Sequence, residues 1–211
     1  MRHVSRAIAL ALAVALASAT ALAACSGIAA PSITPAPTAS STPAPAKTLD
    51  PRAALEASFE STIFMPAFRL RMPATWFGIE RDDALLQVWL DEEKYEITFD
   101  TTYRHAETVE AAIARLRATS GLNPGETAPL TVGGRAGLTF VADPAAAVKF
   151  TDSGFHTNAA GRLRVTVVPT DAGQTITIFV TTADPAGFGE LDEIALRILA
   201  SVEWTGASAA P

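Results

Sequence analysis

The sequence predicts an α+β domain in which a mostly antiparallel sheet of about seven strands is covered by two main helices. Three observations support this: short segments of alternating apolar and polar residues, polar connections between successive segments, and two longer segments with helical spacing. No strand–helix–strand succession indicates a doubly wound fold. The domain is expected at residues 51–205, a length that suffices for one hydrophobic core.

A short helix is expected at the start of this domain. Asp50 suits an N-cap, and Pro51 suits the first helical position. Leu55 and Phe59 are spaced to share one face of that helix.

Alternation predicts three strands after this helix, at residues 68–72, 86–90 and 95–99. The polar stretch 91–94 between the last two indicates a hairpin. A helix is then expected from about residue 106 to residue 120, with Gly121 as its C-cap. Its core face carries Val109, Ile113 and Leu116.

The sequence of the second half of the domain predicts two more hairpins and a second helix. Residues 129–132 and 136–142 flank Gly133-Gly134, and residues 163–167 and 176–180 flank the turn at 170–173. Residues 143–161 are polar and weakly patterned, as in a long loop. The second helix is expected from Asp184-Pro185 to about Ser201, followed by a short terminal strand at 202–204.

The N-terminus has the features of a bacterial secretory signal. Arg2 and Arg6 precede an uncharged apolar stretch at residues 7–21, which is slightly short for a spanning helix. The segment Leu22-Ala23-Ala24-Cys25 resembles the lipobox of bacterial lipoproteins. This resemblance implies cleavage after residue 24 and lipid attachment to Cys25, so the mature chain would sit on the extracytoplasmic face of the cell membrane. An ordinary signal peptide or an uncleaved anchor is the alternative.

Residues 25–50 are rich in Pro, Ser, Thr and Ala and are expected to form a disordered stalk, and residues 206–211 a frayed tail. Cleavage would leave 14 basic and 22 acidic residues, a net charge of −8. Such an acidic chain is not expected to bind nucleic acid, and a single cysteine excludes a disulfide framework. Attachment to anionic membrane would then depend on the lipid.

Three segments of the domain resemble the PsbP-like fold. They are the strand that ends in Pro73-Ala74-Thr75-Trp76, the turn at residues 132–136, and the closing segment 198–204. This fold occurs in photosystem accessory subunits, in a Ran-binding nuclear protein and in small actinobacterial lipoproteins of the LpqN type. Over residues 60–205 the resemblance implies an α/β/α sandwich and an accessory or binding role without catalysis. It implies no active-site residue.

No catalytic motif emerges from the residues themselves. Ser153 and His156 are close in sequence, but a catalytic triad is built by the fold, so a polar loop is the simpler interpretation. The mature chain has two histidines, His105 and His156, fewer than a zinc site normally needs. Its acidic clusters lack the spacing of a calcium loop. We therefore assign no catalytic residue, no metal ligand and no cofactor.

Three aromatic residues are the candidate ligand-binding positions: Trp76, Phe77 and Trp89. They either pack in the core, which is the commoner role of aromatic side chains, or line a cleft for an apolar ligand. The sequence thus predicts a non-catalytic, lipid-anchored envelope protein that is a binding or accessory module of unknown partner, either an envelope protein or a small apolar ligand. The alternatives are a carrier of a small apolar or lipid ligand and, with least support, an extracytoplasmic hydrolase.

Overall fold

The computed structural model of the protein describes residues 48–91, 94–157 and 161–205. The predicted signal peptide, the lipid attachment residue Cys25, nearly all of the predicted stalk and the predicted C-terminal tail lie outside the described residues. Along the chain the elements are β1 (Ala57–Glu60), β2 (Phe68–Met72), β3 (Phe77–Glu80), β4 (Leu85–Asp91), β5 (Tyr95–Asp100), α1 (Val109–Arg117), β6 (Ala128–Val132), β7 (Arg135–Ala142), β8 (Arg162–Pro169), β9 (Thr175–Thr182), the 3-10 helix η1 (Pro185–Gly187), α2 (Phe188–Ala200) and β10 (Glu203–Trp204).

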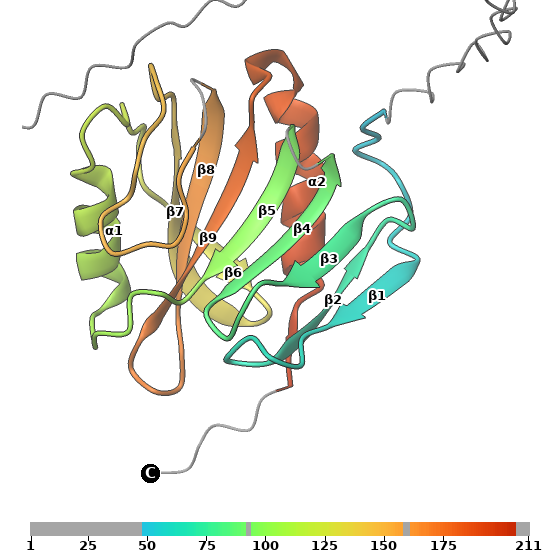
Figure 1. The fold of residues 1–211 in the computed structure, drawn as a ribbon, viewed down its shortest axis with the longest axis horizontal. Helices are drawn as coiled ribbons and strands as arrows, with labels where there is room; N and C mark the ends of the chain where they lie inside the picture. The colour runs from blue at the N-terminus through green and yellow to red at the C-terminus, as the bar shows by residue number, and fades with distance from the viewer. Residues whose placement is uncertain (1–47, 92–93, 158–160, 206–211) are drawn as a thin grey trace, which may run out of the picture. The chain divides into compact units, whose positions relative to one another are not determined.

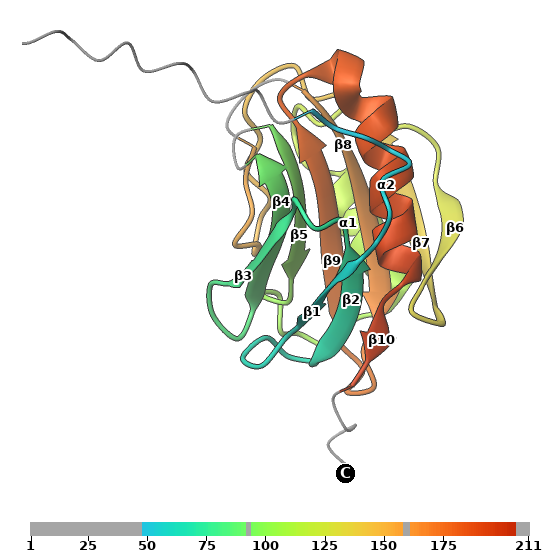
Figure 2. The ribbon, with the colours of Figure 1, turned by 90° about the vertical axis from the view of Figure 1, so that its right-hand side faces the viewer.

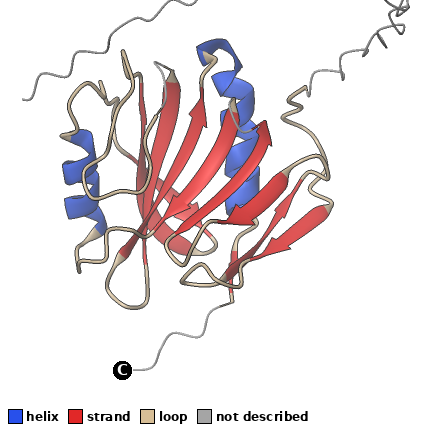
Figure 3. Cartoon of the chain, in the orientation of Figure 1, coloured by secondary structure: helices blue, strands red, loops and turns tan. Residues whose placement is uncertain are grey.

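The strands form two antiparallel sheets (Figure 1). The larger sheet has seven strands in the order β3-β4-β5-β9-β8-β7-β6, and the smaller has three in the order β1-β2-β10. This confirms the predicted α+β class and the antiparallel sheet of about seven strands with two main helices (Figure 3). The separate three-stranded sheet is not anticipated by the sequence.

The larger sheet has a hydrophobic layer on each face. On one face, α2 and the small sheet pack over it (Figure 2) and enclose a cluster that includes Phe68, Phe99 and Trp76. The rings of Phe68 and Phe99 lie 4.7 Å apart. On the other face, α1 and the segment 143–157 cover strands β7 to β9, where Phe155 stacks on Phe179 at 4.2 Å. We call these the inner and the outer face of the larger sheet.

The helix predicted at residues 50–59 is wrong. The side chain of Asp50 accepts a hydrogen bond from the Arg52 N–H at 2.9 Å, but it caps only a single turn. Residues 57–60 instead form β1, which pairs with β2. The spacing of four between Leu55 and Phe59 is also two steps of the period of a strand, and the side chains of β1 alternate between half-buried and exposed.

Helix α1 is shorter than predicted. It begins at Val109 because Thr108 is its N-cap, with the Thr108 hydroxyl accepting from the Ala111 N–H at 3.2 Å. It ends at Arg117, and Gly121 (φ +78°) lies in the turn that follows instead of forming the C-cap. The carboxylate of Glu107, before the helix, binds Arg115 at 2.7 Å.

The other predicted elements are confirmed. Gly133 and Gly134 (φ +56° and +80°) form the two-residue turn between β6 and β7, a backbone conformation that favours glycine. The second helix is preceded by η1, whose N-cap is Asp184, and β10 pairs with β2 as an edge of the small sheet. Among the described residues, no helix has the length and apolar character to cross a membrane.

Candidate functional site

The outer face of the larger sheet is covered on one half only. Along β4, Leu86, Val88 and Leu90 are buried on the inner face, whereas Gln87 and Trp89 point to the outer face and are half-buried. Helix α1 packs mainly on β7 and β8. The outer face is open at β3 and β4, where the side chains are half-buried or exposed, whereas Thr98 and Asp100 on the outer side of β5 are buried.

Four large apolar side chains are exposed on β3 and on the loop that is bonded to it. In the described part of the chain they are Ile63, Met65, Phe77 and Ile79, with exposed fractions of 56, 62, 53 and 38%. Phe77 and Ile79 belong to β3, and Ile63 and Met65 to the loop at residues 61–67 between β1 and β2. We call these four residues the β3 surface.

Glu80 ties the 61–67 loop to β3. One carboxylate oxygen of Glu80 accepts hydrogen bonds from the backbone N–H groups of Thr62, Ile63 and Phe64 at 2.7, 2.9 and 2.9 Å. The other accepts the Thr62 hydroxyl at 2.8 Å. This carboxylate thus fixes the position of Ile63 next to the strand that carries Ile79.

The same bonds set the pKa of Glu80. Burial alone raises the pKa of this carboxyl, but the hydrogen bonds from Phe64, Ile63 and Thr62 together outweigh burial and favour the charged form. The pKa of Glu80 is therefore below its ordinary value of 4.5. The loop is held by a carboxylate that stays ionised at neutral pH.

A row of polar contacts crosses the open face. The Arg81 Nε donates to Gln87 Oε1 at 2.6 Å, and Gln87 Nε2 donates to Glu96 Oε1 at 2.6 Å. The Thr98 hydroxyl donates to the same Glu96 oxygen. The guanidinium of Arg81 lies 5.3 Å from the ring centroid of Trp89, so cation and ring pack together. These contacts hold the polar side chains of the face to one another.

A small pocket of about 230 Å³ lies where this face meets the 143–157 segment. It is lined by Leu85, Gln87, Glu96, Thr98, Gly154, Phe155 and His156. Beside it, the buried Asp100 holds the segment in place, since its carboxylate accepts from the Ser153 hydroxyl and from the Gly154 N–H. The Ser153 hydroxyl thus bonds Asp100 and also accepts the Phe155 N–H at 3.0 Å. This arrangement anchors a loop and gives Ser153 no imidazole partner in the described residues.

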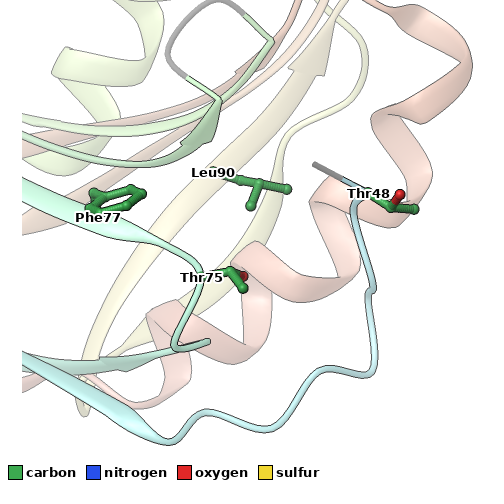
Figure 4. Close-up of a pocket in the computed structure, with 4 residues that line it drawn as sticks. All are labelled: Thr48, Thr75, Phe77 and Leu90. Atoms are coloured by element: carbon green, nitrogen blue, oxygen red, sulfur yellow. The ribbon is translucent and has the colours of Figure 1, made fainter. Parts of the chain in front are cut away.

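A second pocket, of about 270 Å³, opens at the start of β3, beside Phe77 (Figure 4). Thr48, Thr75, Phe77 and Leu90 line it, and most of its wall is apolar. Leu90 of this pocket also belongs to the inner-face cluster, so an apolar ligand bound here would lie against that cluster.

The structure separates the three aromatic residues singled out in the sequence. Trp76 is 4% exposed and belongs to the inner-face cluster. Phe77 is exposed and lines the pocket at the start of β3. Trp89 is half-buried on the outer face, where it pairs with Phe77 across β3 and β4. Only Phe77 and Trp89 thus share a face.

Sequence reasoning missed the other residues of the β3 surface. The alternation of Phe77 and Ile79 with Gly78 and Glu80 was the available signal for β3, but four residues make a weak one. Nothing local indicated that Glu80 would bind a loop 16 to 18 residues earlier. Within the described ranges, no group of three or more His, Cys, Asp or Glu side chains could hold a metal ion.

Comparison with known proteins shows similarity of fold at low sequence identity. The chain is similar to cyanobacterial PsbP from Synechocystis, with 11% identity, a TM-score of 0.39 and coverage of 72% of this chain and 95% of that one. It is also similar to the Ran-binding protein Mog1p of Saccharomyces cerevisiae, with 12% identity, a TM-score of 0.43 and coverage of 71% and 96%. A Mog1 mutant gives 12% identity, a TM-score of 0.44 and coverage of 72% and 98%.

At these identities the likeness concerns the fold alone. The structures found include a PsbP, the kind of fold expected from the sequence. No protein-family model and no curated protein sequence matches the chain.

Proposed function

We propose that this chain is a non-catalytic binding module, held at the extracytoplasmic face of the cell membrane by a lipid on Cys25. We propose further that it docks a partner protein on the β3 surface. The observation that carries the docking proposal is the gathering of Ile63, Met65, Phe77 and Ile79 on one strand and on the loop bound to it. The lipobox resemblance carries the anchoring proposal.

The fixed position of the β3 surface supports docking. Exposed apolar side chains that gather in one place mark interaction sites more often than single ones do. The four hydrogen bonds to Glu80 hold the loop before any partner arrives, so little conformational freedom is lost on binding. Trp89 and Arg81 lie on the same side of the sheet, and both residue types are common among the side chains that dominate binding energy.

The charges beside the β3 surface favour a protein over a lipid bilayer as the partner. Glu80, Asp82 and Asp83 lie at the end of β3 and in the following turn, together with Arg81. Arg104 pairs with Asp83 at 2.8 Å. Acidic side chains therefore outnumber basic ones here by one, and the mature chain as a whole is also acidic. An acidic surface is repelled by anionic headgroups.

Site-specific photo-crosslinking in intact cells of the source organism tests the docking proposal. A photoreactive amino acid at Met65, the most exposed of the four residues, should give a discrete crosslinked protein. Thr131, which is exposed on the opposite edge strand β6, is the matched control position. Absence of a protein adduct at Met65, or equal adducts at both positions, would contradict the proposal.

A small-ligand carrier is the second candidate, and the apolar pocket at the start of β3, beside Phe77, favours it. A fatty acid bound there would contact Phe77 and Leu90. Binding of a spin-labelled fatty acid should then weaken in Phe77→Ser and broaden the NMR signals of Leu90. Binding that does not respond to Phe77→Ser would remove this candidate.

A further inference from the structure

The two edges of the larger sheet differ in how they are protected. At the β6 edge, Pro129 has no N–H to offer to another strand. Helix α2 also contacts β6. Strand β3, at the other edge, contains neither proline nor lysine, the residues that usually discourage pairing with another chain.

The register identifies which backbone groups of β3 point away from the sheet. The Arg81 N–H donates to the Leu85 carbonyl at 2.9 Å, which continues the β3–β4 register as a hydrogen-bonded pair. Hydrogen-bonded pairs alternate along an antiparallel ladder, so Phe77 and Ile79 bond to β4. The N–H and C=O groups of Gly78 and Glu80 therefore face outward.

Among the described residues, these outward groups have no hydrogen-bond partner. No other described residue hydrogen-bonds to the backbone of Gly78 or Glu80, since the bonds at Glu80 all involve its carboxylate. The two side-chain faces of the edge are also unlike each other. Phe77 and Ile79 point to the open outer face, whereas a Cβ on Gly78 would lie 2.5 Å from the Phe59 ring.

We propose that β3 is the docking edge for an extended segment of a partner protein, which pairs with it as an eighth strand of the larger sheet. The segment carries apolar side chains at alternate positions, to contact Phe77 and Ile79, and Lys or Arg beside them. A basic residue is favoured because three acids at the end of the strand, Glu80, Asp82 and Asp83, face two arginines, Arg81 and Arg104. This inference rests on the proposed docking function and specifies how the partner protein binds.

Crosslinking at Ile79 in the full-length chain, in intact cells, identifies the segment. The crosslinked residue of the partner is located by mass spectrometry, and a synthetic peptide of that segment is titrated against the full-length protein in detergent. We expect a sequence of alternate apolar residues with an adjacent Lys or Arg. The protein variant Ile79→Lys should bind the peptide at least tenfold more weakly than the wild type does, and Thr131→Lys on the β6 edge should bind it with unchanged affinity.

N-methylation of the peptide, one amide at a time, tests backbone pairing. Methylation at alternate amides, those that face β3, should weaken binding about fivefold or more, and methylation at the amides between them should have little effect. Equal effects at all amides, or none, would overturn the strand-pairing inference while leaving the docking function standing. A crosslink to a helical segment, to lipid or to a second copy of this chain would also overturn it. No protein adduct at either Ile79 or Met65 would remove the docking function as well.

Discussion

Replacing Glu80 by Gln tests how the β3 surface is held in place. The substitution keeps the shape of the side chain and one carbonyl oxygen that can still accept the N–H groups of Thr62, Ile63 and Phe64. It removes the negative charge, so each bond becomes a neutral one. The Thr62 hydroxyl can turn to accept from the new amide instead of donating.

The expected cost follows from these bonds. A hydrogen bond to a charged group contributes about 1.5–3 kcal/mol, whereas a neutral one contributes about 1 kcal/mol. Three of the four bonds are solvent-exposed, so screening reduces the difference. We expect Glu80→Gln to lower the free energy of unfolding by about 1 kcal/mol at pH 7.

The pH dependence gives the sharper test. The pKa of Glu80 is lowered in the folded protein, so its charge stabilises the fold fully above the ordinary value of 4.5. This stabilisation is lost as the pH falls through the lower, folded-state pKa. The difference between wild type and Glu80→Gln should therefore be constant from pH 7 to about pH 5 and should vanish at lower pH.

Urea unfolding of the full-length protein and the variant, at a series of pH values from 7 to 3, measures this difference. Glu126→Gln is the matched control, because Glu126 is exposed and no hydrogen bond to its side chain is found among the described residues. It should change stability by less than about 0.5 kcal/mol. A Glu80→Gln effect that is absent at pH 7, or that persists unchanged at pH 3, would refute the assigned role of the carboxylate.

Three further predictions concern the anchor, the glycines and a half-buried ion pair. Cys25→Ser should move the protein from the membrane fraction to the soluble fraction after cell fractionation, and retention in the membrane would contradict lipid anchoring. Gly189→Ala should stabilise the fold by about 0.5 kcal/mol, since nothing lies within 4 Å of the added Cβ in this first turn of α2. Gly137→Ala should destabilise the fold by about 2 kcal/mol or more, because its Cβ would lie 2.2 Å from the Val167 carbonyl oxygen. The midpoints of thermal unfolding should therefore move in opposite directions. Arg164 is 15% exposed and bonded to Asp192 at 2.5 and 2.6 Å. Asp192→Ala leaves this arginine without its carboxylate partner, so it should lower the free energy of unfolding in urea by about 2 kcal/mol. A loss below about 0.5 kcal/mol would contradict this.

The sequence predicts the strands of the larger sheet well because alternation is strong where one or both faces are buried. Strands β4, β5, β8 and β9 each supply several apolar residues at the period of a strand. It fails at β1 and β3, which are four-residue edge strands with half-exposed patterns. Each pairs with the next strand along the chain, β1 with β2 and β3 with β4, but four residues give too weak an alternation to predict either pair.

The candidate site was also only partly predictable. Phe77 and Trp89 stand out as aromatic residues, and the structure pairs them across neighbouring strands. Ile63 and Met65 become part of the same surface because Glu80 accepts hydrogen bonds from their loop and the Asp83 carbonyl accepts the Met65 N–H at 3.0 Å. Contacts of this kind depend on tertiary structure, and a single sequence carries no signal for them.

Native mass spectrometry of the full-length protein, released gently from the membrane of its source cells, tests docking on the β3 surface without a label. We expect a complex whose excess mass is that of a polypeptide. The fraction of chain in this complex should fall in Ile79→Lys and stay unchanged in the control Thr131→Lys. A chain that carries only its lipid, a complex with a small apolar molecule, or a polypeptide that is retained equally in both variants would contradict docking on the β3 surface.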